Sequence, residues 1–149
     1  MAEYSSLLPD ILPHVASCPV PSIARASRIV AQDFFQRSEA YTFEIAPTDV
    51  ATSAPQVALT LPAGTRLVAP LTMYLDGERL STTNHEMLAL DYGDWRNSSG
   101  VPRFVMVDDV VGNELVVALP AQQDYPGGLT GRVALKPTRD TNVLADSQM

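Results

Sequence analysis

The spacing of apolar residues changes near residue 40, and this change limits the possible folds more than any other feature of the chain. Before it, apolar residues recur at intervals of three and four, which is the spacing of one helix face. Beyond it, segments such as Tyr41–Ile45 and Gln56–Leu61 alternate apolar and polar residues, as half-buried strands do. The sequence therefore predicts a helical segment over residues 1–40 followed by a β domain over residues 41–136.

The first forty residues contain two candidate helices. The first is short, because Leu8, Ile11 and Val15 share helical spacing but Pro13 prevents the helix from continuing far. The second is long and amphipathic, and we expect it to run from about Ser22 to about Ser38. One face of the long helix carries apolar residues, which are Ile23, Ala26, Val30 and Phe34, widened by Ile29 and Phe35. Because such a face must be buried, it packs either on the sheet or on another copy of the chain.

The region after residue 40 consists of short strand patterns about ten residues apart, separated by glycine and proline turns. Asp76–Gly77 is the strongest hairpin signal, since a two-residue turn of this kind needs positive φ angles. Further expected strands are Glu78–Thr83, His85–Leu90, Arg103–Val111, Glu114–Leu119 and Leu129–Lys136, and Arg66–Leu75 is expected to hold one or two short strands broken near Pro70. This pattern favours an antiparallel β-sandwich or barrel-like domain, so the predicted fold class is α+β.

Three segments are predicted to connect or extend these elements. Asp91–Gly100 has the composition of a polar loop and carries Trp95, and Gly112–Asn113 has that of a turn. Residues 137–149 are polar and lack periodicity, so we expect a C-terminal arm or a disordered tail there.

The charge and the cysteine content exclude several classes of protein. With 10 Lys and Arg against 17 Asp and Glu, the chain has a formal net charge of -7, so phosphate backbones repel it and no direct nucleic-acid specificity is expected. Cys18 is the only cysteine, which excludes an internal disulfide and a multi-thiolate metal site. No apolar run approaches the roughly 18 residues of a membrane span, and no secretory signal is recognisable, so we expect no membrane association.

No combination of residues predicts a catalytic, cofactor-binding or metal-binding site, and we expect a protein without enzymatic activity. His14 and His85 are the only histidines, and no G-x-S-x-G nucleophile elbow is present. Asp108 and Asp109 are adjacent, so their carboxylates would point to opposite faces of a strand. The oxygen-rich run Asp91–Asn97 matches a calcium loop only in part.

Other residues are candidates for contact with a partner. Trp95 could stack on a sugar ring or anchor an interface, or it could fold back onto its own domain. Arg25 and Arg28 could lie on a solvated helix face, or they could meet an acidic groove of a neighbouring subunit. The candidate interface residues are therefore Ile23, Arg25, Ala26, Arg28, Val30, Phe34 and Trp95.

Residues 4–41 combine several features in a fixed order. These are the run Leu7–Val15, the pair Cys18–Pro19, the helix residues Arg25, Ala26, Arg28, Ala31 and Asp33–Ser38, and an aromatic strand start at Tyr41. This order resembles the opening of the adaptor, or head-to-tail connector, proteins of tailed bacteriophages. A weaker similarity lies in Leu129–Thr138, a strand that ends in Lys-Pro like those that close the β part of such proteins.

The resemblance implies a ring-forming virion protein beneath the portal, with twelve copies, helices packed between copies and a β domain facing outward to hold fibres or the nozzle. Its partners would be further copies of itself, the portal protein and tail or fibre proteins, and the virion would be assembled in the host bacterial cytoplasm. Members of the family usually continue from the final strand into C-terminal helices, whereas residues 140–149 show no helical pattern. Either a neighbouring copy completes the helical part, or the protein serves elsewhere in the tail.

A second hypothesis comes from the polar loop. Tyr92, Trp95 and the acidic residues around them would suit a carbohydrate-binding or tail-fibre-docking β module without enzymatic activity.

Overall fold

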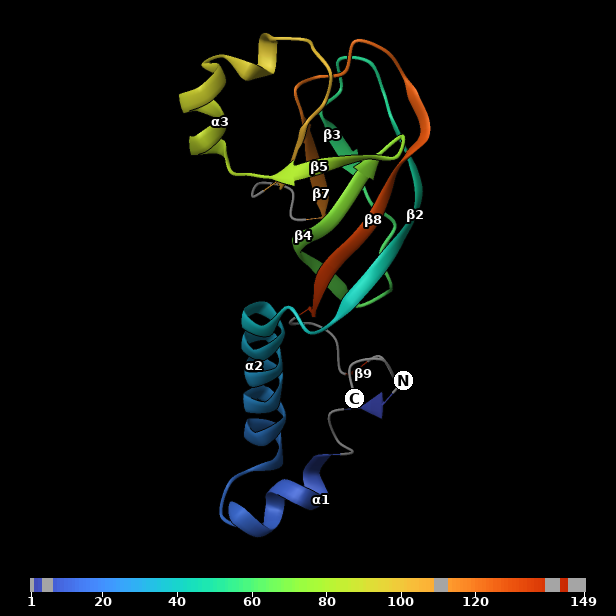
Figure 1. Ribbon diagram of the computed structural model, residues 1–149. Helices are drawn as coiled ribbons and strands as arrows, with labels where there is room; N and C mark the ends of the chain where they lie inside the picture. Colours follow the sequence, from blue (N-terminus) through green and yellow to red (C-terminus); the bar gives the residue numbers. More distant parts are fainter. Residues whose placement is uncertain (1, 4–6, 109–112, 139–142, 145–149) are drawn as a thin grey trace.

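The change of apolar spacing near residue 40 corresponds to a change of architecture in the structure, a computed structural model that describes residues 2–3, 7–108, 113–138 and 143–144. Figure 1 shows helix α2 as a stalk that extends from one end of a barrel-like domain, with α1 at the far end of the stalk. The predicted α+β class, with N-terminal helices followed by a barrel-like β domain, is confirmed.

The helical part begins with two short elements and continues in one long helix. These are α1 (Leu8–Ile11), the 3₁₀ helix η2 (Leu12–His14) and α2 (Val20–Ser38). α2 begins directly after Pro19, which has an extended backbone, so it starts slightly earlier than the predicted Ser22. It ends at the predicted Ser38, because Glu39 adopts the left-handed conformation (φ 51°) and donates its N–H to the carbonyl of Phe35 over 3.1 Å.

A small two-stranded sheet lies beside the helices. β1 (Ala2–Glu3) pairs antiparallel with β9 (Val143–Leu144), so segments from near the two ends of the chain lie side by side (Figure 1). β9 falls within the predicted C-terminal arm, most of which lies outside the described residues.

The β domain is a seven-stranded sheet that nearly closes on itself. Its strands are β2 (Thr42–Val50), β3 (Gln56–Ala58), β4 (Thr65–Leu75), β5 (Glu78–Thr82), β6 (Phe104–Val107), β7 (Glu114–Ala118) and β8 (Tyr125–Pro137). They are arranged in space in the order β2-β8-β4-β5-β6-β7-β3, and the two end strands, β2 and β3, also contact each other. β8 is the longest strand, and it pairs with both β2 and β4.

The hairpin predicted at Asp76–Gly77 is confirmed. β4 and β5 pair antiparallel with Leu75 opposite Glu78, and the two turn residues have φ angles of 48° and 84°. β6 and β7 also pair antiparallel, as predicted, while Gly112 of the turn predicted between them lies outside the described residues.

The strand predicted over His85–Leu90 is wrong, because His85–Tyr92 forms helix α3. The segment predicted as a loop after it contains a 3₁₀ helix, η3 (Trp95–Asn97). Asn84 is the reason for the helix: its side-chain Oδ1 accepts the N–H of Met87 over 2.9 Å, which caps the first turn. In a short apolar run the residue spacing does not distinguish a strand from a helix, so the N-cap residue is the feature that indicates a helix here.

The sheet is mixed rather than antiparallel throughout, which corrects the prediction at one pair of strands. β5 and β6 are parallel neighbours, with Ser81 opposite Phe104 and Thr82 opposite Val105. Parallel neighbours need a crossover connection, and here the segment with α3 and η3 provides it. The error therefore has the same origin as the missed helix.

Two apolar clusters stabilise the β domain. The larger one gathers residues from all the strands of the sheet and from α2, and the smaller one consists of Leu88, Trp95, Met106, Val116 and Ala118. β7 belongs to both, since Leu115 and Val117 enter the larger cluster while Val116 and Ala118 enter the smaller. The segment with α3 and η3 therefore covers the outer face of β6 and β7.

Candidate functional site

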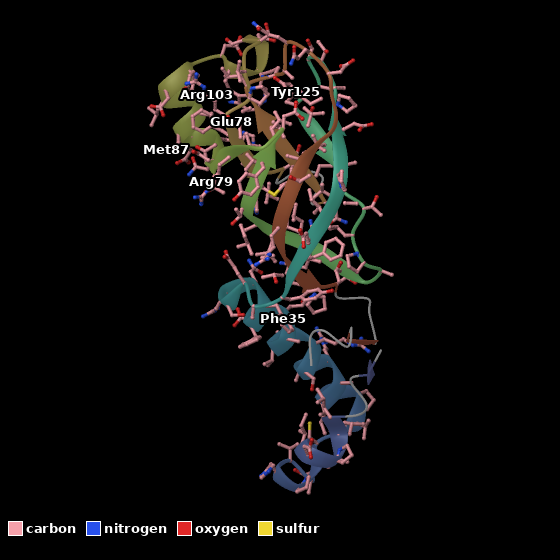
Figure 2. The ribbon with its side chains drawn as sticks, turned by 45° about the vertical axis from the view of Figure 1, so that its right-hand side comes forward. Phe35, Glu78, Arg79, Met87, Arg103 and Tyr125 are labelled. Carbon is pink, nitrogen blue, oxygen red and sulfur yellow. The ribbon has the colours of Figure 1, made fainter. Side chains whose placement is uncertain are left out.

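Helix α2 is joined to the barrel along one side of its C-terminal half. Phe35 is buried there, with its ring edge-on to that of Tyr41 at a centroid distance of 6.2 Å. Gln32 Nε2 donates to the carbonyl of Pro137 over 3.1 Å, and Lys136 Nζ donates to Gln36 Oε1 over 2.9 Å. Figure 2 shows Phe35 at the junction of helix and barrel, so these contacts fix how α2 leaves the barrel.

Two of the predicted interface residues on α2 are covered by their own chain. Arg28 is half-buried and lies two turns before Phe35, hence on the same side of α2. Ile23 is buried at the start of α2, at the end of the stalk where α1 contacts the helix. Neither side chain is therefore on the part of α2 that faces solvent.

The side of α2 opposite Phe35 and Arg28 is apolar and exposed. Ile29, Val30 and Phe34 have 55%, 66% and 55% of their surface exposed. Val30 and Phe34 are one turn apart on the same side of the helix, and Ile29 borders them. We name these three residues the α2 face. Ala26, one turn before Val30, is also exposed and extends this face towards the N-terminus of the helix.

The charge of α2 is opposite in sign to that of the chain as a whole. Val20–Ser38 contains three arginines and one aspartate, a formal charge of +2, whereas the whole chain has -7. Arg25 is exposed one turn before Ile29, so it borders the α2 face. Arg37 Nε lies 2.8 Å from Asp33 Oδ1 in an exposed ion pair, on the side of the helix that carries Val30. An acidic partner surface would be attracted to this helix.

Trp95 is buried within its own domain. Only 4% of its surface is exposed, and it packs in the smaller cluster with Leu88 and Met106. The guanidinium of Arg96 lies 4.8 Å from the ring centroid, and the ring of His85 lies 5.9 Å away. This is the arrangement expected for a tryptophan folded back onto its own domain, and it leaves no open ring face on which a sugar could stack.

A pocket of about 540 Å³ lies beside Trp95. Its lining contains His85, Arg96, Asp108 and Glu114, which are acidic and basic side chains suited to hydrogen bonds with a polar ligand. Of the predicted carboxylate pair, Asp108 is buried, while Asp109 lies outside the described residues. Within the described part of the chain, no group of three or more His, Cys, Asp or Glu residues could hold a metal ion.

One carboxylate joins two loops of the barrel. Asp124 Oδ1 accepts the backbone N–H and the side-chain hydroxyl of Thr52, both over 2.7 Å. These hydrogen bonds, the backbone one first, stabilise the ionised form and hold the pKa of Asp124 below its ordinary value. The contact connects the chain after β2 to the chain before β8, so its role is structural.

A second exposed apolar surface lies on α3, in a segment for which the sequence predicts a strand. Met87, Leu90 and Tyr92 of this surface are 50%, 80% and 40% exposed. The signal that could have identified the helix is the pair of residues at its ends, Asn84 as the N-cap and Gly93 as the C-cap.

Comparisons with known proteins yield no family. Neither the protein-family models nor the curated proteins contain a match to this chain. Among the described residues, no helix combines the length and the apolar character that crossing a membrane would require. Function is therefore inferred from the N-terminal resemblance and from the surface of α2.

Proposed function

We propose that this protein is a structural subunit that assembles with copies of itself through the α2 face, as a head-to-tail adaptor of a tailed-phage virion would. The observation that carries the proposal is the exposure of Ile29, Val30 and Phe34 on a helix that extends from the barrel (Figure 1). An amphipathic helix normally buries its apolar side, and an exposed apolar surface is typical of a protein interface. In the assembly, a surface of a neighbouring copy would bury the α2 face.

The virion setting comes from the N-terminal resemblance, and it involves the same helix. Ala26 and Phe34 belong both to the residues that resemble the adaptor family and to the exposed side of α2. In this setting the helices would pack between copies in a ring, twelve in number as the family implies, and the barrel would face tail or fibre proteins. The role is non-enzymatic, with the portal protein as a further partner.

The area of the α2 face indicates how much contact the assembly needs. Burying one Val, Ile or Phe completely is worth roughly 1.5–3 kcal/mol, so burying the exposed half to two-thirds of three such residues gains roughly 3–5 kcal/mol. Association costs roughly 4–15 kcal/mol in lost translational and rotational freedom. The α2 face alone is therefore too small to hold two copies together, so the surface that receives it must contribute apolar area of its own.

The carbohydrate-binding alternative has less support. Trp95 is buried, and the ring of Tyr92 packs edge-on against Phe104 with centroids 5.6 Å apart. Both aromatic residues that motivated this hypothesis are thus in contact with their own domain.

Sedimentation velocity of the purified chain, alone and mixed with a portal-type protein, tests the proposal. We expect species heavier than the 16.1 kDa monomer, and we expect the double variant Val30→Gln, Phe34→Gln to lose them. Glutamine keeps a high helix propensity while removing the apolar contact. The matched control is Tyr74→Ser, which alters an exposed aromatic residue on β4 and should assemble like the wild type. A wild-type chain that stays monomeric in both conditions would refute the proposal.

A further inference from the structure

Helix α3 carries its exposed apolar residues on the side opposite its buried one. Met87 and Leu90 are three residues apart, so they share one side of the helix, while Leu88 is buried in the smaller cluster. Figure 2 shows Met87 on the side of α3 that points away from the barrel. We name Met87 and Leu90 the α3 face. Leu90 is 80% exposed, so burying the α3 face against another surface would be as favourable as burying the α2 face.

The α2 and α3 faces of one copy lie too far apart to cover each other. In Figure 1, α2 extends from one end of the barrel, and α3 lies beside the other end. Within the described part of the chain neither surface covers the other, so each is open to another molecule.

The two surfaces have opposite charge. Glu86 lies one turn before Leu90 and Asp91 one turn after Met87, so both carboxylates border the α3 face, and both are exposed. His85–Tyr92 contains no lysine or arginine, which gives α3 a formal charge of -2 with histidine neutral. α2 has a formal charge of +2, and its Arg25 is exposed one turn before Ile29. Opposite charges around two apolar surfaces favour their association and fix its orientation.

We propose that the α3 face of one copy receives the α2 face of the next copy. This inference rests on the proposed self-assembly and identifies the surface that α2 meets. Val30 and Phe34 would pack on Met87 and Leu90, with the basic helix α2 beside the carboxylates of α3. Because the two surfaces differ, the contact is heterologous: each copy offers one surface and accepts the other, and successive copies either close into a ring or extend as a filament.

Mixing two blocked variants tests this contact directly. Val30→Gln, Phe34→Gln removes the α2 face, and Met87→Gln, Leu90→Gln removes the α3 face. We expect each variant alone to be monomeric, with self-association weakened roughly a hundredfold, since each lost contact costs roughly tenfold. The equimolar mixture should form a 1:1 complex of twice the 16.1 kDa monomer mass and grow no further, because the joined pair presents only blocked surfaces. Circular dichroism and thermal melting confirm that both variants are folded.

The outcomes separate this inference from the proposed function. If the α3 variant assembles like the wild type while the α2 variant does not, the α3 face is not the acceptor, and self-assembly through α2 stands. If both variants are monomeric and their mixture forms no complex, the heterologous contact is refuted as well. A wild-type chain that does not assemble refutes both proposals. Tyr74→Ser again serves as the control that should change nothing.

Disulfide trapping provides a second measurement that does not depend on losing assembly. Cys18 is the only cysteine, so Cys18→Ser gives a background without thiols. In that background, copies with Val30→Cys mixed with copies with Leu90→Cys should form disulfide-linked heterodimers under mild oxidation, in excess of either homodimer. An excess of Val30→Cys homodimers would indicate a symmetric α2–α2 contact and would overturn the inference.

Discussion

Strands β4 and β8 lie close together at Gly131, and replacing this glycine by alanine should destabilise the barrel strongly. Gly131 lies opposite Met73 and has a φ angle of +145°. A Cβ added there would collide with the carbonyl oxygen of Thr72 and would lie 2.8 Å from both Cα and Sδ of Met73. Two of these atoms belong to the backbone, so the strands would have to separate.

Gly131→Ala should lower the stability of the fold for two reasons, backbone strain and steric overlap. A second glycine, Gly77, allows the backbone strain to be measured alone. Positive φ costs a non-glycine residue about 1–3 kcal/mol, and forcing an extra methyl group into a packed site costs about 1–3 kcal/mol more. Gly77, in the β4–β5 turn, also has positive φ (+84°), but a Cβ there would meet no atom within 4 Å. Gly77→Ala should therefore show only the backbone strain.

Thermal and urea unfolding followed by circular dichroism measure the difference between the two variants. We expect Gly131→Ala to be about 2–3 kcal/mol less stable than Gly77→Ala, which for a chain of this size corresponds to a melting temperature roughly 5–10 °C lower. Equal losses of stability in the two variants would show that β4 and β8 are not in close contact at this point, and the register described here would be wrong.

Three further predictions concern α3 and the loops of the barrel. Asn84→Ala should lower the free energy of unfolding by about 1 kcal/mol and reduce helicity in circular dichroism, whereas Asn84→Asp, which keeps the cap, should do neither. Leu88→Ala should cost about 2–5 kcal/mol in urea unfolding and shift the fluorescence of Trp95, which shares its cluster; an unchanged spectrum would contradict that packing. Because the folded-state pKa of Asp124 is lowered, its ionised form adds stability above its ordinary value of 3.8, and this stability is lost as pH falls through the lowered folded-state pKa. Asp124→Asn should therefore melt below the wild type at neutral pH but not in acid, and Thr52→Ala should raise the pKa of Asp124 in an NMR titration.

Features that depend on residues close together in the chain could be predicted from the sequence. The Asp76–Gly77 turn joins two strands through its own backbone preferences, and α2 follows from the apolar spacing over Ile23–Phe35. Both are local properties, so no knowledge of the rest of the fold was needed.

Features that depend on distant residues could not be predicted. Phe34 and Phe35 are adjacent and equally apolar, yet Phe35 is buried and Phe34 is exposed. Which of the two rings is buried depends on a distant part of the chain. Lys136 donates a hydrogen bond to Gln36, 100 residues away, and this contact fixes which side of α2 faces the barrel. The parallel pairing of β5 with β6 and the burial of Trp95 likewise follow from where α3 packs, which the short apolar run did not reveal.

The position of β8 in the sheet has a consequence for the order in which the protein can be made. β8 pairs with β2 and β4, and it comes after both during synthesis. Until residues 125–137 have left the ribosome, β2 has none of the sheet pairing that β8 gives it, and α2 lacks its bonds to Lys136 and Pro137. Because such long-range pairing forms late, a chain that lacks β8 leaves the apolar residues of its strands exposed to water. In such a chain the orientation of α2 relative to the barrel is not fixed. A copy therefore acquires a rigid stalk only once residues 125–137 have been synthesised.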